Sequence, residues 1–472
     1  MKILLINPPQ LEAINPSLPK IFQEKEDPMP PLGLMYVSSY LKNSAKEKHQ
    51  IKILDCQLEK INHKHLKKII SEETPDIFGI TATSFSLLAA LRAAEIMREI
   101  RPETKIVLGG PHVHIYPAET LSLKEIDFIV LGEGEETFTE FVDNVDQPEN
   151  FYKIKGFGFK KDGEVVINEQ REPIKDLDTL PFPDRRFLPY EKYESVISRK
   201  TPITTMFSSR GCPFKCLFCN RPHLGKIFRA RSAKNVVNEM EECAKIGIQE
   251  IFFYDDTFTV DRRRVVEICD EILKRKLNIG WDVRARVDTI DENLLVLMKK
   301  AGCQRIHYGV EAGTQKILNT LRKGITLEQV EKAFSLTRKI GIQTLGYFMI
   351  GSPGETKKEI SDTVKFAKKI NPDFVTFSIT TPYPATDLYL LGLEKHLLPC
   401  DYWKKFAENP TLDFKPMVWE ENLKKKELKK MLKRAYFSFY FRPGYILKTI
   451  KNIKSYKEFA RKTIAGIKLL EN

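Results

Sequence analysis

The sequence predicts an α/β protein with two consecutive domains of alternating strands and helices, followed by a basic helical region. Three observations support this fold class. Short runs rich in Ile, Val and Leu alternate with segments of helical spacing along most of the chain. A stretch over 146–200, interrupted by Pro and Gly, separates two such series. The 472 residues, 42% apolar and 29% charged, are enough to bury more than one core.

Residues 1–145 predict a doubly wound parallel sheet of the flavodoxin-like (Rossmann-type) kind. Leu87, Leu91 and Ala94 recur at helical spacing between short apolar runs. Five strand–helix units in a row favour parallel strands with helices on both faces. The expected strands are Ile3–Ile6, Ile51–Leu54, Ile77–Thr81, Ile106–Leu108 and Phe128–Leu131.

Residues 146–200 predict a linker with a small hairpin, because Gly156, Gly158 and Gly163 lie among several prolines. A second series of strands and helices covers 201–395. Its six units predict a partial (β/α)6 barrel rather than the complete eight-stranded form. The expected strands are Ile203–Phe207, Ile251–Tyr254, Ile279–Val283, Arg305–Gly309, Thr344–Ile350 and Phe374–Thr380, and the expected helices are 232–246, 261–276, 291–301, 326–340 and 356–370.

Residues 396–472 predict a helical region that carries nearly all of the net charge. The chain has a formal net charge of +13, and 424–472 contain 15 Lys and Arg against 3 Glu. Leu428, Leu432 and Phe439 fall on one face of a basic amphipathic helix. Such a helix suits an anionic lipid surface. It equally suits packing on the barrel with its lysines in solvent, which we favour.

Two features that the sequence lacks, a membrane-spanning segment and a signal peptide, bear on the expected cellular location. No segment reaches the roughly 18 apolar residues of a membrane-spanning helix. The opening MKILLINPPQ has no signal-peptide pattern. We therefore expect a cytoplasmic protein, with 424–472 as a candidate contact with the inner membrane face. A nucleic-acid partner is not favoured.

Three cysteines within eight residues are the strongest chemical signal. Cys212, Cys216 and Cys219 form a C-x3-C-x2-C pattern on a Gly- and Pro-containing loop directly after the first barrel strand. Barrel active sites lie at the carboxyl ends of the strands. Each thiolate could bind one iron of a cubane cluster, which leaves one iron open to another ligand. A structural zinc site would need a fourth ligand, for which only His223 is nearby.

This cysteine spacing at the end of a first barrel strand resembles the radical S-adenosylmethionine (SAM) superfamily. The resemblance implies a [4Fe–4S] cluster whose open iron is chelated by the amino and carboxylate groups of SAM. It further implies cleavage of SAM to a 5′-deoxyadenosyl radical, chemistry that the cofactors carry and the protein positions.

The same resemblance, over roughly Pro202 to Leu390, implies SAM contacts at the ends of later strands. Alternatives remain open for several of them. One of the two adjacent aspartates could instead cap the next helix, the glutamate could begin a helix in solvent, and the glycine could simply make a tight turn. The candidate SAM contacts are Phe218, Tyr254, Asp255, Asp256, Arg284, Glu311 and Gly351.

The loops at the carboxyl edge of the first sheet are small, glycine-rich and hydroxyl-bearing, which suits a large planar cofactor with a nucleotide tail. They and segments such as Pro30–Leu34 resemble the cobalamin-binding domain that precedes the radical core in one subgroup. No D-x-H-x-x-G motif is present, so His112 and His114 are candidates for the lower cobalt position by place alone. The candidate cobalamin contacts are Thr81, Thr83, Ser84, Gly109, Gly110, His112, Gly132, Glu133 and Gly134.

That subgroup includes methyltransferases acting on unactivated carbon or phosphinate phosphorus, hopanoid methylases and the anaerobic magnesium-protoporphyrin ester cyclase. The resemblance implies methyl transfer to an unactivated carbon of a small, apolar or lipid-like substrate. One SAM would methylate cobalamin, a second would generate the radical, and a flavodoxin- or ferredoxin-type donor would supply single electrons. The alternatives are a radical cyclase or carbon–carbon bond-forming enzyme, and an iron–sulfur binding protein whose basic tail binds a membrane or nucleic acid.

Overall fold

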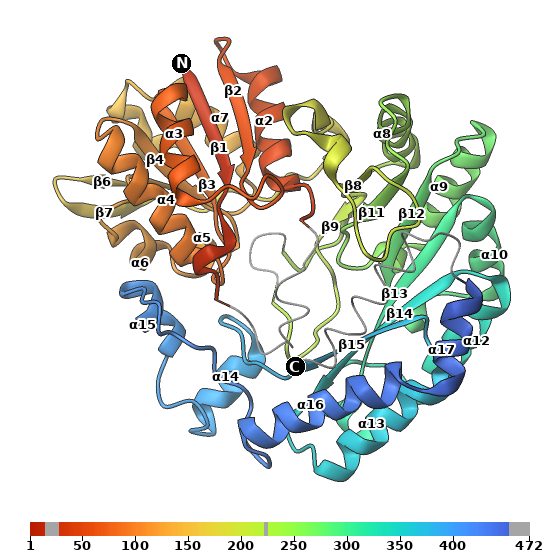
Figure 1. Cartoon of the computed structure of the whole chain (residues 1–472). Coiled ribbons are helices and arrows are strands. Elements are labelled where there is room, and N and C mark those ends of the chain that lie inside the picture. Colours follow the sequence, from red (N-terminus) through yellow and green to blue (C-terminus); the bar gives the residue numbers. More distant parts are fainter. Residues whose placement is uncertain (15–27, 221–224, 453–472) are drawn as a thin grey trace.

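The computed structural model describes residues 1–14, 28–220 and 225–452 and contains two large β-sheets with helices packed on them (Figure 1). A seven-stranded sheet lies in the amino-terminal part, and a six-stranded sheet lies in the second half of the chain. A helical carboxyl-terminal region contacts the cores of both. The fold class predicted from the sequence is confirmed.

The first sheet has the strand order β2-β1-β3-β4-β5-β6-β7, with parallel pairing from β2 to β5. In β1, Leu4 and Ile6 enter one hydrophobic core while Ile3 and Leu5 enter the core on the opposite face. Burial on both faces explains the continuous apolar run. The strands are β1 (Lys2–Asn7), β2 (Gln50–Asp55), β3 (Ile77–Thr81), β4 (Lys105–Gly109), β5 (Phe128–Val130), β6 (Phe157–Lys161) and β7 (Glu164–Ile167). The helices are α2 (Leu32–Ser44), α3 (His63–Glu73), α4 (Leu87–Ile100), α5 (Pro111–Ile115), α6 (Pro117–Ser122) and α7 (Gly134–Asp143).

The hairpin of β6 and β7 extends the first sheet instead of standing alone in the linker. Strand β6 pairs antiparallel with β5. Phe157 stacks on Phe128 with ring centroids 5.6 Å apart. A side chain at Gly158 would meet Ile129 at 2.7 Å, so glycine permits this close approach. Sequence spacing located the hairpin but could not show this pairing.

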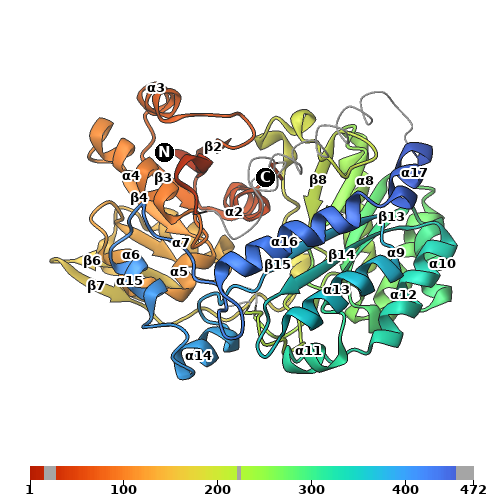
Figure 2. The same ribbon diagram turned by 60° about the horizontal axis from the view of Figure 1, so that its bottom comes forward.

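The second sheet is the predicted barrel of six parallel strands, in the order β15-β14-β13-β12-β11-β8. Each helix that follows a strand packs on the outside of the sheet (Figure 2). The strands are β8 (Ile203–Met206), β11 (Glu250–Phe253), β12 (Gly280–Ala285), β13 (Cys303–Glu311), β14 (Gln343–Ile350) and β15 (Phe374–Ile379). The helices are α8 (Ala233–Lys245), α9 (Arg262–Lys274), α10 (Glu292–Lys300), α11 (Gln315–Thr320), α12 (Leu327–Ile340) and α13 (Lys357–Ile370).

Side-chain caps fix where most of the barrel helices begin. A hydroxyl or carboxylate oxygen accepts from a backbone N–H of the first turn in five of them. Each such cap typically stabilises a helix by about 1 kcal/mol. The capping residues are Ser232, Asp261, Asp291, Thr326 and Thr356.

Buried polar side chains of the linker contact both domains. The Tyr193 hydroxyl donates to Asp55 at the end of β2 over 2.7 Å. Arg185, only 4% exposed, pairs with Glu239 of α8 at 2.5 Å. The predicted linker is thus a packed part of the molecule.

The carboxyl-terminal region contains α14 (Asp387–Glu394), α15 (Tyr402–Glu408), α16 (Lys425–Tyr440) and α17 (Pro443–Asn452). Helix α15 packs on the first domain through Trp403, whereas α16 lies across β15 and α13 of the barrel (Figure 2). Leu428, Leu432 and Phe439 of α16 are buried in the barrel core. Of the two interpretations of this basic helix, packing on the barrel with its lysines in solvent is therefore the one the structure shows.

Two tyrosines of α16 close the outer edge of β15. The Tyr436 hydroxyl accepts from the backbone N–H of Phe377 at 3.0 Å and donates to its carbonyl at 2.8 Å. Tyr440 does the same to Val375 at 3.0 and 2.7 Å. This tyrosine pair satisfies backbone groups that an edge strand would otherwise expose.

Within residues 1–14, 28–220 and 225–452, no helix is long and apolar enough to cross a membrane. Residues 453–472, the end of the basic tail, lie outside the described residues.

Candidate functional site

The cluster loop (residues 211–228) leaves the barrel at the carboxyl end of β8. Its stem is β9 (Ser209–Arg210), paired antiparallel with β10 (Arg229–Ala230). Gly211 has φ +80°, and a side chain there would meet the carbonyl oxygen of Ile227 at 2.2 Å, so the tight turn requires glycine. Residues 221–224, including His223, lie outside the described residues.

The three cysteines of this loop suit a cubane cluster. Cys212 is buried, Cys216 and Cys219 are half-buried, and none of them forms a disulfide. In the described ranges no three His, Cys, Asp or Glu side chains converge as they would around a single metal ion. A cubane takes one thiolate per iron, and three cysteines outside any disulfide can supply such thiolates. The donor set therefore fits an iron–sulfur cluster.

Asp255, which follows β11, supports the base of the cluster loop. Its carboxylate accepts from the Ser208 N–H at 2.7 Å and from the hydroxyls of Ser208 and Ser209 at 2.5 Å each. Asp255 is fully buried. The carboxylate predicted to receive an ammonium group is thus engaged by the chain itself.

Asp256, the second carboxylate of the pair, is exposed. Neither Asp255 nor Asp256 caps the following helix, because Asp261 caps α9. The capping alternative is therefore wrong, and Asp256 remains the candidate contact for an ammonium group.

Arg284 belongs to a polar network on the inner face of the barrel. Its neighbours Trp281 and Val283 on β12 are buried under the outer helices, so alternation turns Arg284 to the opposite face. Its guanidinium lies 4.6 Å from the centre of the Tyr254 ring. The positive charge of Arg284 also opposes the rise that burial causes in the pKa of Tyr347 of β14. These contacts hold a cation at the place predicted for the SAM carboxylate.

A buried histidine sets the direction of the hydrogen bonds in this network. Burial lowers the pKa of His307 despite the nearby carboxylate of Asp282, so the ring is neutral at pH 7. Its Nε2 lies 3.2 Å from Asp282 and its Nδ1 lies 2.9 Å from the Tyr347 hydroxyl. Since Asp282 can only accept, the proton resides on Nε2 and Tyr347 donates to Nδ1. The phenolic oxygen of Tyr347 then keeps its lone pairs for another donor, and the positive charge of Arg284 lies nearby.

Glu311 ends β13 in a position unlike the solvated helix start considered from the sequence. It is only 7% exposed and has φ +74°, at a register irregularity of the strand. Its carboxylate pairs with Lys323 at 2.8 Å. The ammonium of Lys323 lies 5.9 Å from the centre of the Phe218 ring. Glu311 and Phe218, both predicted SAM contacts, are therefore joined through Lys323.

Gly351 forms a tight turn whose open side is occupied by α16. With φ +76°, a side chain there would meet Leu428 at 2.7 Å. The N–H groups of Gly351 and Ser352 donate to Glu355 at 2.7 and 2.9 Å. Burial raises the pKa of Glu355 to about 7. Gly351 therefore makes a tight turn that packs against Leu428 of α16, and its role as a SAM contact stays a prediction.

The loops after β3 and β4 lie against each other at the carboxyl edge of the first sheet. A side chain at Gly110 (φ +100°) would meet the Ala82 carbonyl at 2.7 Å. The Ser84 hydroxyl lies 3.0 Å from His112 Nδ1. His112 lies in α5, not in a loop, and its complete burial lowers its pKa to about 4. Its Nε2 is a buried atom with no partner among the described residues.

The remaining residues predicted for cobalamin border more open space. Thr81 is half-buried and Thr83 is exposed. A side chain at Gly132 (φ +70°) would meet nothing within 4 Å, and Gly109 has a neighbour only at 3.9 Å. Small residues beside open space fit a large planar cofactor at this edge.

The Glu133 side chain points to the cluster loop instead. Its carboxylate pairs with Arg210 at 3.1 Å and with Arg229 at 2.8 Å, while Glu135 pairs with Arg210 at 2.6 Å. Burial alone would raise the pKa of Glu133, but Arg229 and Arg210 hold it below its usual range. We call these four residues the inter-domain clamp. Among Gly132, Glu133 and Gly134, the backbone rather than this carboxylate is left for cobalamin.

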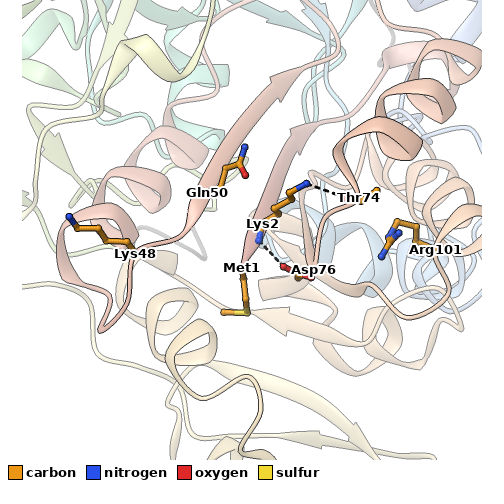
Figure 3. A pocket seen from close by; sticks show the side chains of 7 residues that line it. All are labelled: Met1, Lys2, Lys48, Gln50, Thr74, Asp76 and Arg101. Carbon is orange, nitrogen blue, oxygen red and sulfur yellow. Dashed lines mark hydrogen bonds between the residues drawn. The ribbon is translucent and has the colours of Figure 1, made fainter.

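A hollow of about 550 Å³ lies at the opposite, amino edge of the first sheet (Figure 3). The Lys2 N–H donates to Asp76 at 2.7 Å there. None of the predicted site residues lines it. Its lining residues are Met1, Lys2, Lys48, Gln50, Thr74, Asp76 and Arg101.

Comparison with known protein families shows to which family the chain belongs. The model of the radical SAM superfamily matches residues 206–367, and the model of the B12 binding domain matches residues 21–142. An uncharacterized methyltransferase of Pyrococcus horikoshii is 36% identical, covering 95% of both chains. The chain belongs to the radical SAM superfamily. The resemblance inferred from the cysteine spacing is confirmed.

Another relative and two solved structures are also similar to this radical SAM chain. The anaerobic magnesium-protoporphyrin IX monomethyl ester cyclase of Rubrivivax gelatinosus is 34% identical over 76% of this chain and 66% of its own length. The cobalamin-dependent SAM radical enzyme OxsB, solved with aqua-cobalamin and SAM, has a TM-score of 0.73 at 17% identity, covering 99% of this chain and 72% of its own. The methyltransferase TsrM of Kitasatospora setae, solved with cobalamin and a [4Fe–4S] cluster, has a TM-score of 0.67 at 20% identity, covering 84% and 75%. The last two are likenesses of fold.

The sequence did not predict which side chains form ion pairs and hydrogen bonds around the candidate site. Arg210 stands directly before the cysteine motif, yet its ion pairs reach a loop of the first domain. His307 and Tyr347 lie on the inner face of radical SAM barrel strands. Polar residues alternating with apolar ones in these strands were the available signal, because alternation predicts an inner polar face.

Proposed function

We propose that this protein is a cobalamin-dependent radical SAM methyltransferase that methylates an unactivated carbon of a small molecule. The cluster, SAM and cobalamin would together supply a 5′-deoxyadenosyl radical and a methyl group. Cys212, Cys216 and Cys219 would hold the cluster. A one-electron donor of the flavodoxin or ferredoxin type would be its partner.

The observation that carries this proposal is the contact between two cofactor loops. The stem of the cluster loop pairs with Glu133 and Glu135, directly beside the Gly132–Gly134 backbone proposed for cobalamin. A radical reaction that ends in methyl transfer needs the radical source and the methyl donor close to one substrate. Arg284 and Asp256 would orient SAM through its carboxylate and ammonium groups. Glu311 and Lys323 would shape the space beside Phe218.

Anaerobic reconstitution with iron, sulfide and hydroxocobalamin tests the proposal. We expect about four irons and one cobalt per chain, 5′-deoxyadenosine from SAM, and a labelled methyl group from SAM in the product. Cys219→Ala should lose iron and SAM cleavage. Cys400→Ala, at another half-buried cysteine outside the motif, should keep both. Iron retained in Cys219→Ala, or SAM cleavage without cobalt binding, would contradict the proposal.

A radical cyclase is the second candidate, favoured by the 34% identical ester cyclase. Product analysis separates the two functions. A methyltransferase incorporates the labelled methyl group of SAM, whereas a cyclase yields 5′-deoxyadenosine and a product without the label.

An apolar or lipid-like substrate and peripheral membrane contact through 424–472 remain predictions from the sequence. Helix α16 has its apolar face on the barrel, so Phe437, Ile446 and Leu447, 56%, 41% and 59% exposed, are the large apolar side chains left for lipid in the described part of this region. Binding to vesicles of anionic lipid, but not of neutral lipid, is expected from this hypothesis. Its absence would remove the membrane role.

A further inference from the structure

The inter-domain clamp is built from both ends of the cluster-loop stem. Arg210 and Arg229 are cross-strand partners in the β9–β10 pair. Both guanidinium groups bind the carboxylate of Glu133, which precedes α7 in the first domain. Glu135 adds a second carboxylate to Arg210 at 2.6 Å. The stem that carries the cysteines is therefore held by the B12-binding domain at both of its strands.

All four clamp side chains are shielded from solvent. Their exposed fractions are 4% for Arg210, 9% for Arg229 and 5% for each glutamate. Glu133 also accepts from the N–H of Ile174 in the linker at 2.7 Å. Paired buried charges add little net stability compared with apolar side chains, but they specify one geometry because each charge needs its partner.

The other side of the stem is held by the barrel. Ser208 and Ser209 donate to Asp255, which follows β11 of the barrel. Tyr36 of α2 adds a contact from the first domain, with its ring centre 5.0 Å from Arg210. The stem is thus fixed between the two domains, and a shift of the Gly132–Glu135 loop must be transmitted to the residues directly before Cys212.

We propose that Arg210 and Glu133 are positioning residues that couple cobalamin binding in the first domain to cluster binding in the second. This inference rests on the proposed function. By linkage, loading one cofactor must then change the affinity for the other, and the effect must be reciprocal. A clamp that served only stability would leave the two affinities independent.

Hydroxocobalamin affinity, measured by absorbance on the full chain with and without the reconstituted cluster, tests the coupling. We expect wild-type protein with a cluster to bind hydroxocobalamin about tenfold more tightly than protein without one. In Glu133→Gln this ratio should fall to about one, although iron per chain stays at the wild-type level. Arg210→Lys keeps the charge but loses the two nitrogen atoms that bind Glu133 and Glu135 separately. It should give an intermediate ratio.

Arg171→Gln is the matched control. Arg171 pairs with Glu136 of α7 at 2.9 Å, but it lies in the linker, and its other side-chain partners, Thr137 and Glu140, also belong to α7. It should keep the wild-type ratio. If Glu133→Gln does not fold, Arg229→Lys replaces it with the same expectation.

Three results would overturn the inference. They are a wild-type ratio of one, an unchanged ratio in the clamp variants, or an equal loss in Arg171→Gln. Failure of wild-type protein to bind hydroxocobalamin at all would overturn both this inference and the proposed function. Binding without coupling would overturn this inference alone.

Discussion

Replacement of Asp255 by Asn should loosen the base of the cluster loop. The carboxylate accepts from the Ser208 N–H at 2.7 Å and from the hydroxyls of Ser208 and Ser209 at 2.5 Å, all buried. A hydrogen bond to a charged group contributes about 1.5–3 kcal/mol. Asn keeps one accepting oxygen but turns a donor toward its neighbours. We expect a loss of about 3 kcal/mol of local stability, near the lower bound for breaking a buried charge network.

At 1.36 kcal/mol per tenfold change in an equilibrium constant, this loss corresponds to about a 100-fold increase in the equilibrium constant for local unfolding at Ser208. Amide hydrogen exchange of peptides covering 207–212 measures it directly. Iron bound per chain after anaerobic reconstitution should fall in parallel, because the cysteines follow this stem.

Asp256→Asn is the matched control, because the Asp256 side chain is exposed whereas Asp255 is buried. It should keep wild-type exchange over 207–212 and wild-type iron content but bind SAM more weakly. Asp255→Asn with unchanged exchange and full iron content would refute the supporting role assigned to Asp255. Equal effects of the two variants would show that the two carboxylates do not divide these roles.

Three further substitutions have defined outcomes. Tyr436→Phe should speed exchange at the Phe377 amide about tenfold or more, because that N–H loses its acceptor at 3.0 Å; an unchanged rate would contradict the edge-closing role. Glu355 has its pKa raised to about 7 by burial, so the folded state binds more protons than the unfolded state, and stability should fall by about 3 kcal/mol as pH rises from about 4.5 to 7. Glu355→Gln should abolish this fall in the free energy of unfolding, measured from denaturant unfolding curves at several pH values. A pH dependence that persists in the variant would belong to another group. Tyr347→Phe removes the hydroxyl that bonds to His307 beside Arg284 and should weaken SAM binding about tenfold by calorimetry at unchanged iron content; wild-type SAM affinity would show that the network does not position Arg284.

The strands and the fold class were predictable because local pattern dictates them. Ile3–Ile6 is a continuous apolar run since helices cover both faces of β1. The cysteine spacing likewise carries its chemistry within eight residues. These features depend on neighbours in sequence.

The functions of several side chains were not predictable because their partners are distant in sequence. Asp255 binds Ser208, 47 residues away, and Glu133 binds Arg229, 96 residues away. Gly351 faces Leu428 of a helix that the sequence could place on the barrel or on lipid. In each case the residue type was compatible with a ligand contact, and the contact within the chain depends on tertiary packing that the sequence does not show.

The tyrosine pair has a consequence for any shortening of the chain. Removing residues from 424 onward would strip the hydroxyls from the backbone of β15 and leave an unpaired strand of alternating buried and half-buried residues at the open side of the barrel. Bare edges of this kind recruit strands from other molecules and cause aggregation. Loss of activity in such a truncation would then reflect self-association rather than a lost membrane contact. Shortening that begins after 452 keeps both tyrosines and avoids this ambiguity.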